Sequence, residues 1–369
     1  MRNTINQQLN MKHDIFNDLF VLELANNHWG NVERGLQIID AYADVIKQNG
    51  VKASIKLQFR DVDTFIHKDF RSLKDYRYIS KTLATQMGED EDRILVEAIR
   101  NHGLVTMSTP FDEVSVDVCV RLGVDVLKIA SSDINDWVLI NKIAQTGKPV
   151  IVSTGGASLK DIHKCVNFFN ERQIPLAVNH CVAQYPTPKE CMDLAQIDLL
   201  LKLFPDNVIG LSTHEHNDHI DDAIMMAYAK GARTFERHID IPNPEKGVSP
   251  YCSLPEDVDR WIKGYKRAVA MEGSYASSRR AIPAHETTYL DALVRGVYAK
   301  KDLPAGHKLT AEDVYFAIPV QKGQLSCREF DATETLTAAV SADGPLTLGC
   351  VQADYLDDET QTLISHRGL

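Results

Sequence analysis

The sequence predicts an α/β fold, a parallel (β/α)8 barrel followed by a small β-rich domain. Between about residues 20 and 240, short apolar runs alternate with longer amphipathic stretches. Eight such alternations are typical of a closed barrel of parallel strands with helices outside. After residue 290 the pattern changes, and 295–320 shows short β-type runs broken by "PAG". This change predicts a separate second domain.

The apolar runs give eight expected strands, and the amphipathic stretches give seven expected helices. Asp112 and Ser158 are expected helix N-caps, because their side-chain oxygens can accept from backbone N–H groups of the first turn. The expected strands are 19–25, 53–59, 104–110, 125–131, 149–155, 175–181, 207–214 and 232–239. The expected helices are 32–49, 88–102, 112–122, 136–146, 158–171, 190–204 and 218–230.

The predicted organisation has a barrel between an irregular start and a linked second domain. The start is 1–19, the barrel 20–272, the linker 273–290, the second domain 291–352 and the C-terminal tail 353–369.

Composition excludes several classes of function. The net charge of −11 argues against a nucleic-acid or anionic-membrane surface, so an anionic substrate needs lysines gathered locally. Seven cysteines without a C-x-x-C pair indicate reduced thiols, as in a cytoplasmic protein. No apolar run reaches the roughly 18 residues of a membrane span, and the first residues lack the apolar core of a signal peptide. We therefore expect a cytoplasmic protein.

Polar residues stand where the expected strands end. Active sites of such barrels lie at the carboxyl ends of the strands, so we expect these side chains to converge on one site. Chemically versatile residues at these ends are Glu23, Lys56, Gln58, Ser108, Thr109, Lys128, Ser131, Ser153, Thr154, His180, His214, Glu236 and His238.

The segment "STHEHNDH" (212–219) has the H-x-H-x-D-H spacing of metallo-β-lactamase-type hydrolases. A two-metal hydrolase is therefore one alternative function. Against it, those hydrolases carry the motif early in the chain, whereas here it follows about seven β/α units. The hydrolase interpretation also leaves Lys56 and Lys128 unexplained. Its ligands would be His214, His216, Asp218 and His219.

Short segments in a fixed order carry a family resemblance. They are "LELANNHWG" (22–30), "KLQ" (56–58), "STPFD" (108–112), "LKIASSDI" (127–134), "KPVIVSTGG" (148–156), "HCVAQYPTP" (180–188), "IGLSTH" (209–214) and "FERHID" (235–240). With them the chain resembles the sialic acid (N-acetylneuraminate) synthase family, including its legionaminic, pseudaminic and spore-coat relatives. The segment "RGVYAKKDLPAGHKLTAEDV" (295–314) resembles the antifreeze-like SAF domain of the same family.

The resemblance implies a transferase that condenses phosphoenolpyruvate with an open-chain aldose. The product is a 2-keto-3-deoxy sugar acid, and phosphate leaves by C–O cleavage. The family uses a divalent metal, usually Mn²⁺, with Mg²⁺ or Co²⁺ as alternatives. Its two metal-binding histidines match His214 and His238. Two imidazoles leave positions open for water and an aldehyde oxygen, which suits a Lewis-acid role.

The resemblance also implies roles for the other residues. Lys56 and Lys128 would bind phosphate and carboxylate, Glu23 would handle protons or water, and Glu236 would act beside the metal. For both glutamates the alternative is a salt bridge with a lysine. The catalytic set is Glu23, His214, Glu236 and His238. The substrate-binding set is Lys56, Gln58, Thr109, Lys128, Ser131, Asp133, Ser153 and Tyr185.

Three departures from the family pattern cluster on the aldose side. Ala183 stands where the family commonly has asparagine, and Ser249 stands where it often has aspartate. Ile318 lies near the place of an arginine that contacts the N-acetyl group in sialic acid synthases. A site built to bind an acetamido group has unpaired donors without it. We therefore expect an aldose other than N-acetylmannosamine: another amino sugar, a deoxy sugar or a non-acetylated aldose.

The expected partners are phosphoenolpyruvate, an aldose and a second copy of the chain, with no nucleic acid or membrane. The family exchanges SAF domains between two chains, which implies a domain-swapped homodimer. A 3-deoxy-octulosonate-8-phosphate-type synthase is an alternative within the same enzyme class, and the SAF-like tail argues against it. A decayed synthase acting as a scaffold is a further alternative. The retained lysines and histidines argue against that role.

Overall fold

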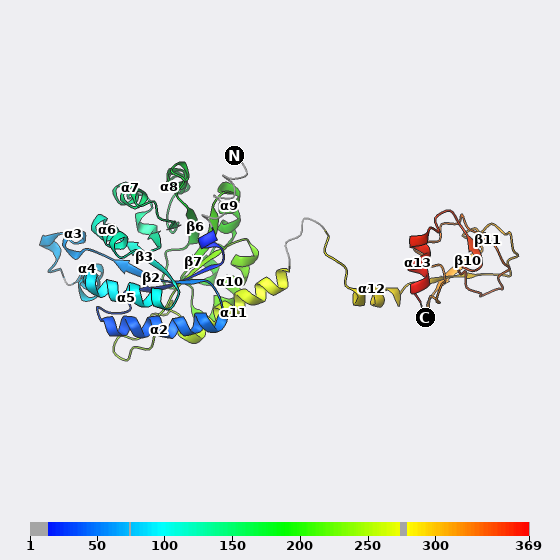
Figure 1. The fold of residues 1–369 in the computed structure, drawn as a ribbon, viewed down its shortest axis with the longest axis horizontal. Helices are drawn as coiled ribbons and strands as arrows, with labels where there is room; N and C mark the ends of the chain where they lie inside the picture. The colour runs from blue at the N-terminus through cyan, green and yellow to red at the C-terminus, as the bar shows by residue number, and fades with distance from the viewer. Residues whose placement is uncertain (1–13, 74, 274–278, 369) are drawn as a thin grey trace. The chain divides into compact units, whose positions relative to one another are not determined.

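The computed structural model describes residues 14–73, 75–273 and 279–368. The chain divides into two compact units, Met1–Ser274 and Tyr275–Leu369, and each is considered by itself (Figure 1). Residues 1–13 of the predicted irregular start and residues 274–278 of the predicted linker lie outside the described residues.

In the described part of the first unit, eight parallel strands close into a barrel. The closing pair is β1 with β8, in a register that sets Phe20 opposite Phe235 and Glu23 opposite His238. The eight-stranded barrel predicted from the sequence is confirmed. The strands are β1 (Leu19–Ala25), β2 (Ala53–Phe59), β3 (Val105–Pro110), β4 (Val126–Ile129), β5 (Val150–Ser153), β6 (Leu176–Cys181), β7 (Val208–Thr213) and β8 (Thr234–His238).

Helices follow the strands around the outside of the barrel (Figure 1). The main ones are α2 (Val32–Asn49), α5 (Glu89–Asn101), α6 (Glu113–Arg121), α7 (Trp137–Gln145), α8 (Leu159–Glu171), α9 (Ala195–Leu203), α10 (Ile220–Ala229) and α11 (Pro255–Glu272). Between β2 and α5 the chain adds α3 (Val62–Phe65), η2 (Lys68–Phe70) and α4 (Arg77–Ala84).

Local sequence explains where these helices begin and end. The Asp112 carboxylate accepts from the Ser115 N–H at 2.7 Å, and the Ser158 hydroxyl caps α8 in the same way. Both N-caps predicted from the sequence are confirmed. Helix α2 ends at Gly50, which adopts φ +60 in the left-handed region that favours glycine.

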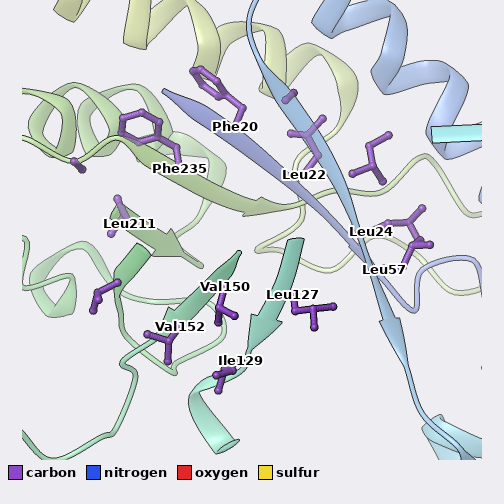
Figure 2. Close-up of a cluster of buried hydrophobic side chains, with 14 of the residues drawn as sticks. Phe20, Leu22, Leu24, Leu57, Leu127, Ile129, Val150, Val152, Leu211 and Phe235 are labelled. Carbon is purple, nitrogen blue, oxygen red and sulfur yellow. The ribbon is translucent and has the colours of Figure 1, made fainter. Parts of the chain in front are cut away.

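The apolar core lies between the outer face of the barrel and the helices. Figure 2 shows part of it, including Phe20 and Phe235 on the two strands that close the barrel. Their ring centroids are 5.5 Å apart, and the Trp261 ring of α11 meets Phe20 edge-on at 5.1 Å. A continuous apolar outer surface of this kind is what a parallel sheet covered by helices requires.

A second, smaller apolar cluster fills one end of the barrel interior. It contains Phe16, Leu19, Val21, Met107, Val126, Ile151 and Ala177. Because side chains alternate along a strand, Val21 and Glu23 face the same side, as do Val126 and Lys128. The interior therefore changes from apolar to charged toward the carboxyl ends of the strands. The apolar layer forms a floor beneath that charged end.

The second unit is small and built from short antiparallel pairs, as predicted. Strand β9 (Gly296–Ala299) pairs with β10 (Val314–Ala317), and β11 (Thr335–Leu336) pairs with β12 (Val351–Gln352). Their apolar residues form a core of their own around Val297 and Leu346.

The structure differs from the predicted organisation at three places. Helix α12 (Ala284–Asp291) lies in the stretch predicted as a linker. Helix α13 (Asp358–His366) lies in the predicted tail, where Ile364 is buried and Arg367 binds Glu329. The predicted irregular start also includes η1 (Asp14–Phe16), whose Phe16 is buried in the floor cluster. Among the described residues, no helix combines the length and apolar character needed to cross a membrane.

Close packing inside the barrel makes Gly210 of β7 hard to replace. A methyl group on Gly210 would overlap Thr234 and Asn179 of the neighbouring strands. Overpacking of this kind typically costs about 1–3 kcal/mol. We predict that Gly210→Ala lowers the free energy of unfolding by at least that amount, measured by urea denaturation.

The matched control is Gly88→Ala, because Gly88 has no positive φ and its added methyl would lie 3.7 Å from the Glu91 carboxylate. It stands at the N-cap of α5, where alanine costs up to about 1 kcal/mol. Equal destabilisation by the two variants would contradict the packing argument.

Candidate active site

An open cavity of about 370 Å³ lies at the carboxyl ends of the barrel strands. Eleven of the twelve residues predicted as catalytic or substrate-binding line it: Glu23, Lys56, Gln58, Thr109, Lys128, Ser131, Ser153, Tyr185, His214, Glu236 and His238. Closure of the barrel brings them together from distant parts of the chain.

Glu236 of β8 joins two buried lysines across the barrel. Its Oε1 lies 3.0 Å from the Lys56 Nζ and its Oε2 lies 2.7 Å from the Lys128 Nζ. The Lys56 Nζ also lies 3.0 Å from Oε2 of Glu23. All four side chains are at most 5% exposed. Two cations and two anions therefore balance one another at buried positions that line the cavity.

The pKa values of Glu236 and Glu23 are shifted in opposite directions. Burial alone raises the pKa of Glu236, but Lys128 and Lys56 outweigh burial and hold that pKa below its ordinary value. Burial raises the pKa of Glu23, and the nearby Lys56 offsets this only in part. Glu236 thus stays ionised, whereas Glu23 is the better candidate for a group that donates and accepts a proton.

The pKa values of the two lysines are also shifted in opposite directions. Burial lowers the pKa of Lys128, with Glu236 opposing it. Burial acts on Lys56 in the same direction, but its two glutamate neighbours raise the pKa of Lys56 above the ordinary value. Lys128, which bonds only to Glu236 among the described side chains, is the more available of the two for a new anion.

Hydroxyl groups of Thr109, Ser131 and Ser153 line the same cavity as the two lysines. The Ser153 Oγ is buried and has no hydrogen-bond partner within the described residues. The Lys56 Nζ donates to the Thr109 Oγ1 at 3.4 Å, and the Ser131 Oγ accepts from the Gly155 N–H at 3.0 Å. A Cβ at Gly155 would crowd Ser131, so glycine keeps this side of the cavity open. A buried donor without a partner is costly unless a ligand satisfies it.

Two histidines face the same cavity from β8 and the end of β7. The His214 Nδ1 lies 3.1 Å from the Val182 carbonyl oxygen, which leaves Nε2 for a ligand. The His214 and His238 ring centroids are 5.3 Å apart, and the rings of Tyr185 and Tyr251 pack against them at 4.1 and 5.2 Å. Burial lowers the pKa of His214 to about 4 and that of His238 well below the ordinary value. Both imidazoles are therefore neutral, the form that binds metals.

This donor set fits a divalent ion that keeps several open positions. The described residues hold no group of three or more His, Cys, Asp or Glu side chains arranged around one metal position. Water and substrate oxygens would have to complete the coordination of an ion at the two histidines.

The H-x-H-x-D-H segment does not form a hydrolase-type metal centre. His214 lines the cavity, but His216 and Asp218 are 54% and 76% exposed and pair with each other at 3.2 Å. Strand β7 ends at Thr213, and the chain then turns into the short helix η5 (Asn217–His219), so His216, Asp218 and His219 do not line the cavity. The arrangement does not support the two-metal hydrolase.

One predicted substrate-binding residue does not line the cavity. Asp133 follows β4 in the short helix η3 (Ser131–Asp133), where burial raises its pKa to about 6. His180, which was expected to converge on the site, does not line the cavity, and both His180 and His28 make local bonds. The His180 Nε2 lies 2.7 Å from the Met192 carbonyl oxygen, and the His28 Nδ1 accepts from the Gly30 N–H.

Sequence reasoning missed several residues of the site. Ser212 donates to the Glu236 Oε1 at 3.0 Å, and strict alternation with His214 could have revealed it. Arg60 follows β2 and stacks on the cavity-lining Phe111 ring at 3.6 Å. It also donates to the Gln58 Oε1 at 3.0 Å. Arg60 lies in a loop, where no periodic pattern predicts its direction.

The three departures from the family pattern lie in different places. Ala183 lines the cavity, so the site lacks an amide there. Ser249 is in the loop after β8, and its carbonyl oxygen accepts from the Cys252 N–H. Ile318 is in the second unit and 61% exposed.

Fold and site together define a parallel barrel with a buried lysine–glutamate cluster next to a pair of buried histidines. Residues 40–276 match the NeuB family. The chain is 29% identical to the spore coat polysaccharide biosynthesis protein SpsE of Bacillus subtilis, covering 91% of this chain and 93% of that protein. It is 31% identical to the pseudaminic acid synthase of Campylobacter jejuni, covering 80% and 85%.

Solved structures of related proteins have a similar fold. A putative spore coat polysaccharide biosynthesis protein E from Chromobacterium violaceum has a TM-score of 0.84 and 38% identity, covering 91% of this chain and 100% of that one. The sialic acid synthetase of Leptospira borgpetersenii has a TM-score of 0.65 and 26% identity, covering 74% and 91%. The chain belongs to the NeuB family, the family of the sialic acid synthases, and it is an enzyme of that family.

Buried neutral histidines predict a loss of stability in acid. Burial lowers the pKa of His28 to about 4, whereas an unfolded histidine titrates near 6.5. Between these values only the unfolded chain takes up the proton, so the free energy of unfolding falls as the pH falls. We predict that His28 accounts for about 3 kcal/mol of this loss at pH 4.

The test compares urea unfolding of the metal-free wild type and His28→Asn from pH 7 to pH 4. Asparagine can still accept from the Gly30 N–H, so the variant isolates the titration. Its stability should fall less in acid than that of the wild type. Parallel curves for the two proteins would show that His28 is not buried as a neutral group.

Proposed function

We propose that this enzyme condenses phosphoenolpyruvate with an open-chain aldose and releases phosphate by C–O cleavage. The observation that carries the proposal is the buried Lys56–Glu236–Lys128 bridge beside the unpartnered Ser153 hydroxyl. A small acid with several negative charges can replace internal carboxylates as the partner of buried lysines, and phosphoenolpyruvate is such an acid. The family membership supports the same chemistry.

Lys128, Lys56 and the nearby hydroxyl groups bind phosphoenolpyruvate in this proposal. The cluster has no net charge of its own, because two glutamates balance two lysines. Entry of the substrate draws the Lys128 Nζ away from Glu236 and gives Ser153 a partner. Thr109 and Ser131 donate to the same anion. Water is displaced as the substrate enters, which strengthens each of these bonds.

His214 and His238 would hold the divalent ion, with Mn²⁺ first and Mg²⁺ or Co²⁺ as alternatives. Their neutral state and the open Nε2 of His214 are the observations that support this assignment. When bound, the ion supplies a Lewis acid for the aldehyde oxygen. Tyr185, which packs on His214, and Gln58 lie on the aldose side of the site.

The reaction forms one C–C bond and breaks one C–O bond. C3 of phosphoenolpyruvate attacks the aldehyde carbon, water adds to C2, and the bond from C2 to the phosphate oxygen breaks. Glu23 takes one proton from the attacking water and passes it to the alkoxide formed from the aldehyde, and the second water proton leaves the C2 hydroxyl with the phosphate as the keto group forms; the raised pKa of Glu23 suits it to this transfer. Glu236 remains a carboxylate, keeps Lys56 in place and faces the developing positive charge at C2.

The aldose is proposed to be one other than N-acetylmannosamine. Ala183 removes a hydrogen-bonding amide from the cavity wall, while the groups assigned to phosphoenolpyruvate are all present. A site without such donors loses its preference for an acetamido group.

We further propose that the second unit is an SAF domain and that two chains exchange these domains in a cytoplasmic homodimer. Its antiparallel pairs support the first point. The presence of this unit disfavours a 3-deoxy-octulosonate-8-phosphate-type synthase. A monomer in light scattering at micromolar concentration would contradict the dimer.

The proposed reaction predicts phosphate release that depends on one aldose. We expect release from phosphoenolpyruvate with Mn²⁺ when a panel of aldoses is screened, and a product mass equal to aldose plus pyruvate. Absence of phosphoenolpyruvate binding would overturn the proposed function. A highest kcat/KM for N-acetylmannosamine within the panel would overturn the aldose assignment only.

The anion site predicts a selective effect of Lys128→Met. Hydrogen bonds to charged groups contribute about 1.5–3 kcal/mol, so the Kd for phosphoenolpyruvate should rise about 10- to 100-fold in calorimetry. Glu236 keeps Lys56 as its partner, and the variant should fold. The control is Lys142→Met, which removes a surface ion pair with Asp117 and should leave the Kd unchanged. Similar affinities for both variants would remove Lys128 from the site.

A further inference from the structure

Two residues beside the metal-binding histidines form a buried ion pair that the proposed chemistry does not use. Arg237 precedes His238 on β8, and Glu215 follows His214 after β7. Both side chains are 0% exposed, and the Arg237 NH1 donates to the Glu215 Oε1 at 2.7 Å. The pair therefore connects the two chain segments that carry the histidines.

Every polar end of this pair is bonded to one of these segments or to the loop that follows β8. The Arg237 NH2 donates to the Glu215 carbonyl oxygen at 3.0 Å and to the Asn217 Oδ1 at 2.7 Å. Its Nε donates to the Ser253 hydroxyl, and the Thr213 hydroxyl donates to the other oxygen of the Glu215 carboxylate. A guanidinium with five N–H donors is suited to fix several groups in one plane.

The same network holds the backbone of both histidines. The Ser253 N–H donates to the His238 carbonyl oxygen at 2.9 Å, and Ser253 itself is bonded to Arg237. The Thr187 N–H donates to the His214 carbonyl oxygen at 2.9 Å, beside a parallel bridge between Thr187 and Glu215. The ion pair thus adjoins the backbone of both histidines, through Ser253 at His238 and through Glu215 itself, which directly follows His214.

Stability alone is a poor explanation for a pair placed here. Desolvation of two charges often cancels their attraction, so a buried ion pair is commonly no more stable than apolar residues of similar volume. The ion pair instead fixes the geometry of the chain segments that it joins. It also explains the polar 214–219 segment, in which only His214 faces the cavity while Glu215 and Asn217 build the link to β8.

We propose that Arg237 and Glu215 are positioning residues that hold His214 and His238 at the spacing a divalent cation requires. This inference rests on the proposed function, because it takes these histidines as the metal ligands. Partners that orient metal ligands from behind typically change metal affinity or activity by 10- to 100-fold when mutated.

The test measures Mn²⁺ binding to the full chain without substrate, by the electron paramagnetic resonance signal of free Mn²⁺. Arg237→Gln should weaken Mn²⁺ binding by about 10- to 100-fold. Arg237→Lys, which keeps the charge but not the fork of donors, should give an intermediate loss. Calorimetry without metal should give a Kd for phosphoenolpyruvate within about twofold of wild type for both variants. Circular dichroism and thermal melting establish that each variant is folded.

A matched control is Arg367→Gln in the second unit. Arg367 is also buried and forms two bonds with Glu329, at 2.8 and 2.6 Å, and Glu329 belongs to the second unit as well. Its loss should leave Mn²⁺ binding unchanged. If Arg237→Gln does not fold, Arg237→Lys and Glu215→Gln replace it in the same comparison.

The outcomes separate the positioning role from the proposed function. Folded Arg237 variants with wild-type Mn²⁺ affinity, or with equal losses of Mn²⁺ and phosphoenolpyruvate binding, would overturn the positioning role while leaving the proposed reaction intact. A wild-type chain that binds phosphoenolpyruvate but no divalent cation would overturn the metal assignment and the positioning role together. A selective loss of Mn²⁺ binding supports both.

Discussion

The ion-paired carboxylate of Glu236 is the interaction on which the site depends. It holds Lys56 of β2 and Lys128 of β4 in the barrel interior, where each unpaired charge would cost several kcal/mol. Such a cluster is stable while its charges balance, and it can exchange an internal carboxylate for the anionic groups of a substrate. Two lysines are thereby kept together in one cavity of a protein whose net charge is −11. The raised pKa of Glu23 follows from the same burial.

The barrel makes this cluster possible by separating apolar and charged layers along its axis. Val21 and Val126 belong to the apolar floor, and two residues later Glu23 and Lys128 belong to the site. The end of the site that carries His214 and His238 is built differently. There the buried pair of Arg237 and Glu215 joins two strand ends from outside the cavity. Buried ion pairs thus hold both parts of the site. Glu236 with its lysines lies within the barrel, and Arg237 with Glu215 lies behind the histidines.

Much of the barrel could be predicted because apolar runs and amphipathic stretches alternate regularly along the sequence. The strand ends gave most of the cavity-lining residues, since parallel strands must present their carboxyl ends together. Arg60 and Ser253 could not be predicted in the same way, because they lie in loops. Arg237 lies on β8 between two cavity residues, and its partners Glu215 and Ser253 come from other segments of the chain. Helices α12 and α13 were missed because their short segments lack a strong apolar stripe. Asp133 was assigned to substrate binding by resemblance, but the η3 turn does not place it in the cavity lining.

A crystal structure with phosphoenolpyruvate and Mn²⁺ bound would test the central claim most directly. We predict phosphate or carboxylate oxygens of the substrate within hydrogen-bond distance of the Lys128 Nζ and the Ser153 Oγ. We also predict that Glu236 keeps Lys56, and that Mn²⁺ lies at His214 and His238. A substrate bound elsewhere, with Lys128 still paired to Glu236 and Ser153 still without a partner, would contradict the account.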